Sequence, residues 1–252
     1  MSTALPKIAL IIPARNEELS LPGVLSRVPH LITRVVVVDN GSTDGTARVA
    51  AAYGATCVTE PAAGYGRACL AGLAALRNDP PDIVAFVDAD GSDELACLPV
   101  LIAPVASGEQ DFVLGERIPT TRKALSFQQR FGHLLATGLI RLFWKQCYHD
   151  LGPMRVISWD ALERLGMADQ DFGWTVEMQV RAIKQRLKIQ EIPVPYYQRS
   201  AGKSKISRTI SGTLKAGSTI LWIIGRELAQ ELRHDKHHTA LPDSGITAGA
   251  AP

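Results

Sequence analysis

Two aspartates separated by one residue, Asp88 and Asp90, follow the apolar run Ile83–Val87. Residues two apart in a strand point the same way, so both carboxylates are expected to leave the same edge of a sheet. Such a pair suits a hard divalent cation, because Mg²⁺ typically takes one or two protein carboxylates together with substrate phosphates. Acidic pairs after strands are also common in solvated turns and helix caps. The triplet therefore predicts a metal site only together with other motifs.

Further polar motifs follow other apolar runs. These runs alternate with helical segments, a pattern typical of a mostly parallel sheet covered by helices. Ligands of such α/β sheets bind beyond the carboxyl ends of the strands, where Pro13, Asp39 and Arg67 are expected to lie beside Asp88. The predicted strands are Ile8–Ile12, Val35–Val38, Ala55–Thr59, Ile83–Val87 and Phe112–Leu114.

The second half of the chain is less regular. Its periodicity predicts amphipathic helices over residues 125–145 and 174–187, and a strand over residues 189–194 that Pro195 ends. Apolar residues then continue at helical spacing over residues 206–232. Three glycines in that stretch, Gly212, Gly217 and Gly225, predict a break into two helices.

The composition bounds the protein class. The chain has 252 residues, 46% of them hydrophobic, which is enough to bury a sizeable core. Its four cysteines show no C-x-x-C spacing, so neither a disulfide nor a zinc site is expected. A secretory signal and an apolar run of about 18 residues are both missing. We therefore expect a cytoplasmic protein that spans no membrane and has no nucleic-acid partner.

Basic residues gather late in the chain. Residues 181–215 hold nine Lys or Arg residues against the single Glu191, although the net charge of the whole chain is only +2. A solvated helix face explains part of this excess. A surface that meets phosphates, on a ligand or on a membrane, explains more of it.

Seven motifs occur in a fixed order and carry a resemblance to a known family. The first four resemble family 2 glycosyltransferases, which have the GT-A fold, and the last three resemble the branch of polyprenyl-phosphate (dolichyl-phosphate) sugar synthases. The motifs are Ile11–Glu18, Val38–Thr46, Gly64–Ala68, Asp88–Ser92, Asp150–Arg155, Phe172–Met178 and Ala201–Lys205. The resemblance implies a GT-A catalytic domain over residues 1–205. The helical spacing of apolar residues predicts a C-terminal amphipathic segment over 206–234, and the loss of periodicity predicts a disordered tail over 235–252.

The resemblance also implies a reaction. It is the inverting transfer of a sugar from a UDP- or GDP-sugar to a polyprenyl phosphate at the membrane surface, with Mg²⁺ or Mn²⁺ as cofactor. A bound cation neutralises the charge that develops on the leaving diphosphate. We accordingly expect peripheral contact with the cytoplasmic face of the membrane. A membrane partner protein and a homo-oligomer stay open as further partners.

The resemblance assigns the nucleotide to individual positions, and the chemistry of the residues suggests the other roles. Asp88 and Asp90 are expected to hold the metal, and the carboxylates of Asp39 and Glu17 to accept hydrogen bonds from the nucleotide. The expected nucleotide-binding residues are Pro13, Arg15, Glu17, Asp39, Arg67, Asp88 and Ala89. The expected catalytic residues are Asp90, Asp171 and Glu177, and the acceptor phosphate is assigned to Arg155, Arg199, Lys203 and Lys205. Helix capping is the alternative role for Asp39 and Asp44, and a surface charge is the alternative for Arg67.

The acceptor decides whether a catalytic base is needed. A hydroxyl must lose a proton as it attacks, so a carboxylate within reach contributes strongly. Asp150, Asp171 and Glu177 are the candidates for this base. A lipid phosphate is already ionised and needs positive charge more than it needs a base.

Departures from the branch leave alternatives open. No spanning segment follows the catalytic domain, Arg15 stands where many relatives have Tyr or Phe, and Met154 stands where Phe is frequent. A soluble glycosyltransferase acting on a hydroxyl and a non-catalytic nucleotide-sugar-binding module are therefore alternatives. Asp88–Ser92 is also similar to the D-x-D-G-[ST] motif of haloacid dehalogenase-like phosphatases. That motif follows the first strand of the phosphatase core, whereas three predicted strands precede it here.

Overall fold

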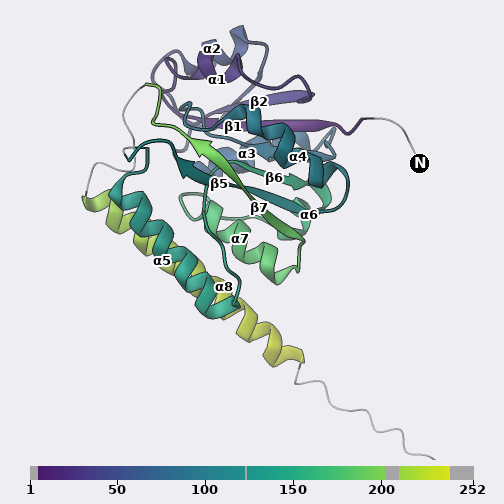
Figure 1. Ribbon diagram of the computed structural model, residues 1–252, viewed down its shortest axis with the longest axis vertical. Coiled ribbons are helices and arrows are strands. Elements are labelled where there is room, and N and C mark those ends of the chain that lie inside the picture. Colours follow the sequence, from purple (N-terminus) through teal and green to yellow (C-terminus); the bar gives the residue numbers. More distant parts are fainter. Residues whose placement is uncertain (1–4, 123, 202–209, 239–252) are drawn as a thin grey trace, which may run out of the picture.

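The computed structural model describes residues 5–122, 124–201 and 210–238 (Figure 1). Within these residues a seven-stranded sheet carries helices on both faces, which confirms the predicted α/β architecture. The strands are β1 (Ile8–Ala14), β2 (Arg34–Asp39), β3 (Thr56–Thr59), β4 (Ile83–Phe86), β5 (Phe112–Pro119), β6 (Arg155–Ser158) and β7 (Ile189–Tyr196). The helices are α1 (Leu21–Leu25), α2 (Thr46–Ala52), α3 (Tyr65–Leu76), the 3₁₀ turn η1 (Leu95–Cys97), α4 (Leu98–Ala106), α5 (Phe127–Trp144), α6 (Trp159–Leu165), α7 (Trp174–Lys184) and α8 (Ile210–His238).

The order of the strands creates a place for a ligand. It is β3-β2-β1-β4-β6-β5-β7, and β1 pairs in parallel with both β2 and β4. β2 and β3 therefore lie on one side of β1, and the next strand in the chain, β4, lies on the other side of β1. Such a switch point leaves a crevice where the carboxyl ends of two neighbouring strands meet.

Strand β6 was not predicted. It is antiparallel to both β4 and β5, and it is the reason that the sheet is only mostly parallel. It has four residues and begins with a buried arginine, Arg155. A run this short with a charged first residue carries no clear period of two, which explains why the sequence pattern did not reveal it.

The prediction that Pro195 ends the last strand was wrong. β7 continues to Tyr196 and pairs with β5 along its whole length. β7 is the outermost strand of the sheet on that side. An edge strand tolerates proline because a nitrogen on the open side makes no ladder hydrogen bond.

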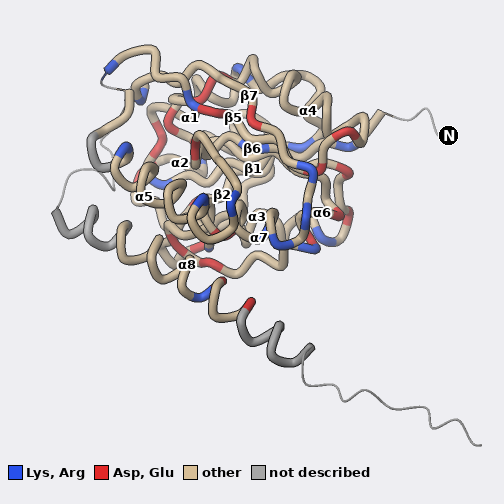
Figure 2. Tube along the Cα trace, turned by 60° about the horizontal axis from the view of Figure 1, so that its bottom comes forward, with Lys and Arg blue, Asp and Glu red and all other residues tan. Residues whose placement is uncertain are grey.

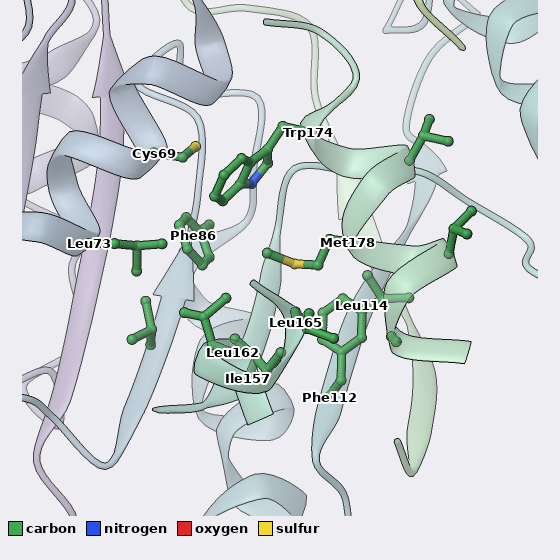
Figure 3. Close-up of a cluster of buried hydrophobic side chains, with 14 of the residues drawn as sticks. Cys69, Leu73, Phe86, Phe112, Leu114, Ile157, Leu162, Leu165, Trp174 and Met178 are labelled. Carbon is green, nitrogen blue, oxygen red and sulfur yellow. The ribbon is translucent and has the colours of Figure 1, made fainter. Parts of the chain in front are cut away.

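Each face of the sheet buries its own hydrophobic cluster. In β1, Ala9 and Ile11 contact one cluster, and Leu10 and Ile12 contact the other. Figure 3 shows part of the first cluster, where the rings of Trp174 and Phe86 lie 6.2 Å apart. Burial on both faces explains why the central strands read as continuous apolar runs.

Helices α5 and α8 lie side by side and run in the same direction (Figure 1). Gly132 of α5 lies next to the side chain of Ile220 on α8. Twelve residues further along α5, Nε1 of Trp144 donates a hydrogen bond to Oε2 of Glu231 on α8 at 2.9 Å. No helix among the described residues is long and apolar enough to cross a membrane.

Two expectations for the C-terminal part need correction. α8 is one continuous helix, so the predicted break at its glycines does not occur. Residues 235–238 belong to this helix and not to the tail, because the helical backbone extends to His238. Residues 239–252 lie outside the described part of the chain.

A buried ion pair ties the loop before β6 to β5. The carboxylate of Asp150 accepts hydrogen bonds from Nε of Arg117 at 2.6 Å and from its Nη2 at 2.7 Å. Burial alone would raise the pKa of Asp150, but the hydrogen bonds and charge of Arg117 hold it below its usual value. Asp150 is therefore committed to the fold, and the expectation that it could serve as a base was wrong.

We predict that Asp150→Ala lowers the free energy of unfolding by about 3–5 kcal/mol, because it leaves the Arg117 guanidinium buried without its partner. Urea unfolding at pH 7 measures this loss. Since the folded-state pKa is depressed, the stabilisation is present above the unfolded-state pKa of about 4 and disappears as the pH falls through the folded-state value. The difference between wild type and variant should therefore shrink in acid.

The control for this comparison is Asp79→Ala. Asp79 pairs with Lys7 and Arg34 at the surface, and its side chain is 54% exposed. We expect a much smaller effect, because solvent screens exposed ion pairs. An equal loss in both variants would contradict the structural role given to Asp150.

Candidate active site

A pocket of about 330 Å³ opens where β1 and β4 end. Its walls come from the segments after these two strands, from α3 and α5, and from the loop before α7. Eight residues that the sequence analysis selected line it together: Pro13, Arg15, Glu17, Asp88, Ala89, Asp90, Asp171 and Arg199. The switch point thus brings together residues up to 186 positions apart in the chain.

Asp88 and Asp90 both reach the pocket but have different surroundings. Oδ1 of Asp90 accepts hydrogen bonds from N and Oγ of Ser92 at 2.9 and 2.5 Å. Burial raises the pKa of Asp88 well above its usual value, and the neighbouring Asp90 and Asp93 carboxylates add to the shift. The turn that follows requires Gly91, whose φ is +76° and whose position would bring a Cβ within 2.7 Å of Ser200 Oγ.

Asp93, which was not among the predicted site residues, completes a crowded group of three carboxylates. It is 1% exposed, and its Oδ2 accepts a hydrogen bond from the main-chain N–H of Asp88 at 2.9 Å. Its Oδ1 has no hydrogen-bond partner among the described residues. Burial raises the pKa of Asp93 to about 7, and the charge of Asp90 contributes. The spacing of this acid, three residues beyond Asp90, was the only available signal.

Arg199 links two carboxylates across the pocket. Its Nη1 lies 3.1 Å from Oδ2 of Asp90, and its Nη2 donates to Oε1 of Glu17 at 2.5 Å. Oε2 of Glu17 accepts a hydrogen bond from Ser20 Oγ at 2.6 Å. Arg199, which was expected at the acceptor phosphate, therefore contacts both Glu17, expected at the nucleotide, and Asp90, expected at the metal.

Two expected nucleotide ligands lie outside the lining of this pocket. Asp39 is 9% exposed, and its Oδ1 accepts a hydrogen bond from the main-chain N–H of Ser42 at 3.1 Å. Arg67 also does not line the pocket. The adjacent Asn40 does line it and holds the segment before α3, because its Oδ1 accepts from the main-chain N–H of Gly64 at 2.9 Å.

Asp44 has the structural role given above as its alternative. Its Oδ1 accepts a hydrogen bond from the main-chain N–H of Thr46, the first residue of α2, at 3.0 Å. Its Oδ2 accepts from the main-chain N–H of Glu18 at 3.2 Å. The carboxylate therefore fixes the start of α2 against the segment after β1.

Five further lining residues had no individual role assigned from the sequence. Asn40, Tyr65 and Phe172 lie within motifs named above. Gln129 and Tyr196 lie in no motif, and the tertiary fold alone brings them to the pocket.

The expectation that Glu177 is a catalytic base was wrong. Its side chain is completely buried in α7 and does not line the pocket. Oε2 accepts hydrogen bonds from the main-chain N–H groups of Ala168 at 3.0 Å and Asp169 at 2.8 Å. Asp171, in contrast, does line the pocket and is the only one of the three base candidates that does so.

The expectation for Arg155 was also wrong. Its side chain is 1% exposed, and its Nη2 donates a hydrogen bond to the carbonyl oxygen of Gly152. The guanidinium lies 6.0 Å from the centre of the Phe112 ring, inside the core. It therefore cannot meet an acceptor phosphate in the pocket. Lys203 and Lys205 lie outside the described residues.

Comparison with known proteins gives the family. The family model described as glycosyl transferase family 2 matches residues 9–166. The chain belongs to glycosyl transferase family 2. An uncharacterized glycosyltransferase of Mycobacterium tuberculosis is 40% identical over 209 residues, covering 83% of this chain and 94% of the relative. An undecaprenyl-phosphate mannosyltransferase of Micrococcus luteus is 30% identical over 228 residues, covering 82% of this chain and 90% of the relative.

The fold of this family 2 glycosyltransferase has close counterparts among solved structures. Glucosyl-3-phosphoglycerate synthase from Mycobacterium tuberculosis, in complex with Mn²⁺, UDP-glucose and phosphoglyceric acid, matches with a TM-score of 0.71. The match has 22% sequence identity and covers 96% of this chain and 82% of that one. It confirms the predicted GT-A fold.

The carboxylates of the family 2 glycosyltransferase fit a divalent cation. No group of three or more His, Cys, Asp or Glu side chains within the described segments could hold a metal ion by itself. Asp88 and Asp90 nevertheless offer hard oxygen ligands at the pocket wall. Two carboxylates, with phosphate oxygens and water completing the set, are the arrangement that Mg²⁺ commonly adopts.

We predict that Asp90→Asn weakens Mn²⁺-dependent binding of UDP or GDP at least tenfold, because it removes one charged metal ligand. Isothermal titration calorimetry with and without EDTA measures the effect. The melting temperature should change little, since the loss of the Arg199 contact is offset by weaker repulsion from Asp88. Asp160→Asn on the surface of α6 is the matched control. Wild-type nucleotide binding that is equally tight in excess EDTA would contradict the metal role.

Proposed function

We propose that this glycosyltransferase transfers a sugar, with inversion, from a UDP- or GDP-sugar to a polyprenyl phosphate at the membrane surface. The observation that carries the proposal is the position of α5. Gln129 in its first turn lines the pocket, while Phe131 and Leu134 on the same helix are 53% and 70% exposed. Exposed apolar side chains therefore begin within two turns of Gln129 on the same helix, on its outer side, where a membrane would present a lipid acceptor.

Exposed apolar side chains occur on both α5 and α8. Six of the twelve exposed large hydrophobic side chains in the described residues belong to α5 and α8. We call these six side chains the α5/α8 face: Phe131, Leu134, Leu142, Phe143, Leu221 and Trp222. Exposed apolar patches of this kind support contact with a membrane or another protein.

Charge favours a membrane as the partner of this face. Arg130, Arg141 and Lys145 are exposed on or directly after α5, next to the apolar side chains. Within α8, residues 217–225 carry no charged side chain, and this stretch is tan in Figure 2. Apolar side chains bordered by basic ones suit an interfacial helix on anionic lipid. The name of the Micrococcus luteus relative, an undecaprenyl-phosphate mannosyltransferase, supports a lipid-phosphate acceptor.

The proposed chemistry uses the residues that line the pocket. Arg15, Glu17 and Asn40 would bind the nucleotide, and Asp88 and Asp90 would hold Mg²⁺ or Mn²⁺. The cation would neutralise the charge that develops on the leaving nucleoside diphosphate. Arg199 would turn from Asp90 toward the acceptor phosphate, which attacks without help from a base because it is already ionised.

A soluble glycosyltransferase acting on a hydroxyl is the second candidate. The observation in its favour is Asp171, a carboxylate in the pocket wall that could accept the proton of a hydroxyl. The phosphoglyceric acid complex of the structurally similar synthase supports small acceptors in this fold.

Asp171→Asn separates the two candidates. If a polyprenyl phosphate is the acceptor, we expect kcat to fall less than about tenfold, because no base is needed. Loss of a general base would lower kcat by ~10²–10⁴. The assay compares transfer from UDP- and GDP-sugars to a short-chain polyprenyl phosphate, to the corresponding polyprenol and to phosphoglyceric acid. If the enzyme transfers sugar only to hydroxyl acceptors, and Asp171→Asn lowers kcat by the larger factor, the lipid-phosphate acceptor is wrong and the soluble hydroxyl-directed enzyme takes its place.

The membrane contact has its own test. Leu134→Glu combined with Trp222→Glu should weaken binding to phosphatidylglycerol liposomes at least tenfold, because both charges would enter the apolar side of the interface. Liposome flotation measures binding, and higher salt should weaken it as screening increases. Val100→Glu is the matched control, since Val100 is 58% exposed on α4, outside the α5/α8 face. Wild-type protein that stays unbound at low salt would contradict the proposed membrane contact.

A further inference from the structure

A loop that forms part of the pocket wall is held from two sides. This 168–172 loop carries Asp171 and Phe172, which line the pocket. On one side the main-chain N–H groups of Gly66 and Arg67 donate to the carbonyl oxygens of Asp171 and Gln170 at 3.2 and 3.0 Å. The approach is so close that a Cβ on Gly66 would lie 2.1 Å from the carbonyl oxygen of Asp169. The first turn of α3 thus fixes the loop through its backbone.

On the other side the loop is held by a buried carboxylate, that of Glu177. Oε2 of Glu177 accepts the N–H groups of Ala168 and Asp169, the first two residues of the loop. Hydrogen bonds to a charged acceptor in a buried setting are stronger than neutral ones. Oε1 of the same carboxylate is paired with Arg181 at 2.9 Å and with Nη2 of Arg226. One oxygen of Glu177 therefore binds the loop, and the other binds the two arginines.

Arg226 connects the loop to α8. Its guanidinium lies 5.0 Å from the centre of the Trp222 ring, and Trp222 belongs to the α5/α8 face. α8 also meets the end of the loop directly, since a Cβ on Gly173 would lie 2.5 Å from Cγ1 of Ile223. A continuous set of contacts thus runs from an exposed side chain of α8 to the pocket wall.

We propose that Glu177 is a positioning residue that holds the 168–172 loop in the pocket wall and, through Arg226, couples the placement of this loop to α8. Glu177 does not touch the substrates. It sets where Asp171 and Phe172 lie, and a shift of α8 changes that placement. The activity part of this inference rests on the proposed function, whereas the loop itself can be observed without any acceptor.

The neighbouring Glu227 provides a matched control. It is 1% exposed and pairs with Arg181 at 3.1 Å, Lys184 at 2.9 Å and Arg226 at 2.9 Å. Glu177 and Glu227 thus share two of their cationic partners, but only Glu177 also binds the loop. A role limited to joining α7 and α8 would make the variants Glu177→Gln and Glu227→Gln equivalent.

Hydrogen exchange followed by mass spectrometry tests the proposal directly. In Glu177→Gln, exchange of the peptide that contains Ala168 and Asp169 should accelerate about tenfold or more, the factor expected when a charge-assisted hydrogen bond is lost. In Glu227→Gln the same peptide should exchange as in wild type. Arg226→Gln, a milder change at a partly exposed position, should accelerate it less than Glu177→Gln does. Equal exchange of this peptide in all variants would overturn the proposal.

Kinetics provide the second readout. We expect the two variants to lose similar amounts of melting temperature. Glu177→Gln should nevertheless lower kcat/KM at least tenfold, and Glu227→Gln less than twofold. Equal kinetic losses in both variants would overturn the positioning role. If wild-type protein transfers no sugar to any acceptor, the proposed acceptor is wrong. Hydrogen exchange, together with Mn²⁺-dependent binding of UDP and GDP, then still decides the role of Glu177.

Discussion

Three carboxylates within six residues, Asp88, Asp90 and Asp93, are the constraint on which the site depends. Burial and mutual repulsion raise the pKa of Asp88 and of Asp93, so the protein must supply positive charge nearby. Arg117 and Arg199 provide it, and both lower the pKa of Asp88. Each arginine is in turn fixed by a further acid, Arg117 by Asp150 and Arg199 by Glu17. The pocket is therefore an alternating charge network in which a divalent cation has a place because negative charge is in excess.

The sequence predicted those parts of the structure that short-range patterns determine. Buried parallel strands have apolar runs, so β1, β2 and β4 were found with ends displaced by no more than two residues. The aspartates after β4 were found because the end of a parallel strand is where a ligand is expected. The order of β1 and β4 in the sheet then brought Pro13 and Asp88 into one pocket, as predicted, whereas Asp39 and Arg67, expected beside them, do not line it.

Tertiary contacts determined what the sequence pattern could not show. Glu177 and Arg155 have the residue types of a catalytic base and a phosphate ligand, but packing decided their roles. Glu177 faces main-chain N–H groups of a loop that precedes its own helix, and Arg155 faces carbonyl oxygens inside the core. A charged residue that satisfies buried backbone groups has the same sequence signal as one that binds a substrate. Gln129 is the converse case, because only the packing of α5 brings it to the pocket.

Under the proposed function, the α5/α8 face determines how firmly the enzyme holds a membrane. Complete burial of a large apolar side chain contributes about 1.5–3 kcal/mol, and these six are roughly half exposed, so each can gain about 1 kcal/mol. Basic residues near an anionic surface add about 1 kcal/mol each. Ordering and desolvation oppose this gain, and the net result is reversible adsorption comparable to that of one acyl chain. Reversible adsorption suits a reaction whose donor dissolves in water while its acceptor stays in the lipid. α5 contributes to both, because Gln129 lines the pocket while Phe131, half a turn later, lies exposed on the opposite side of the helix.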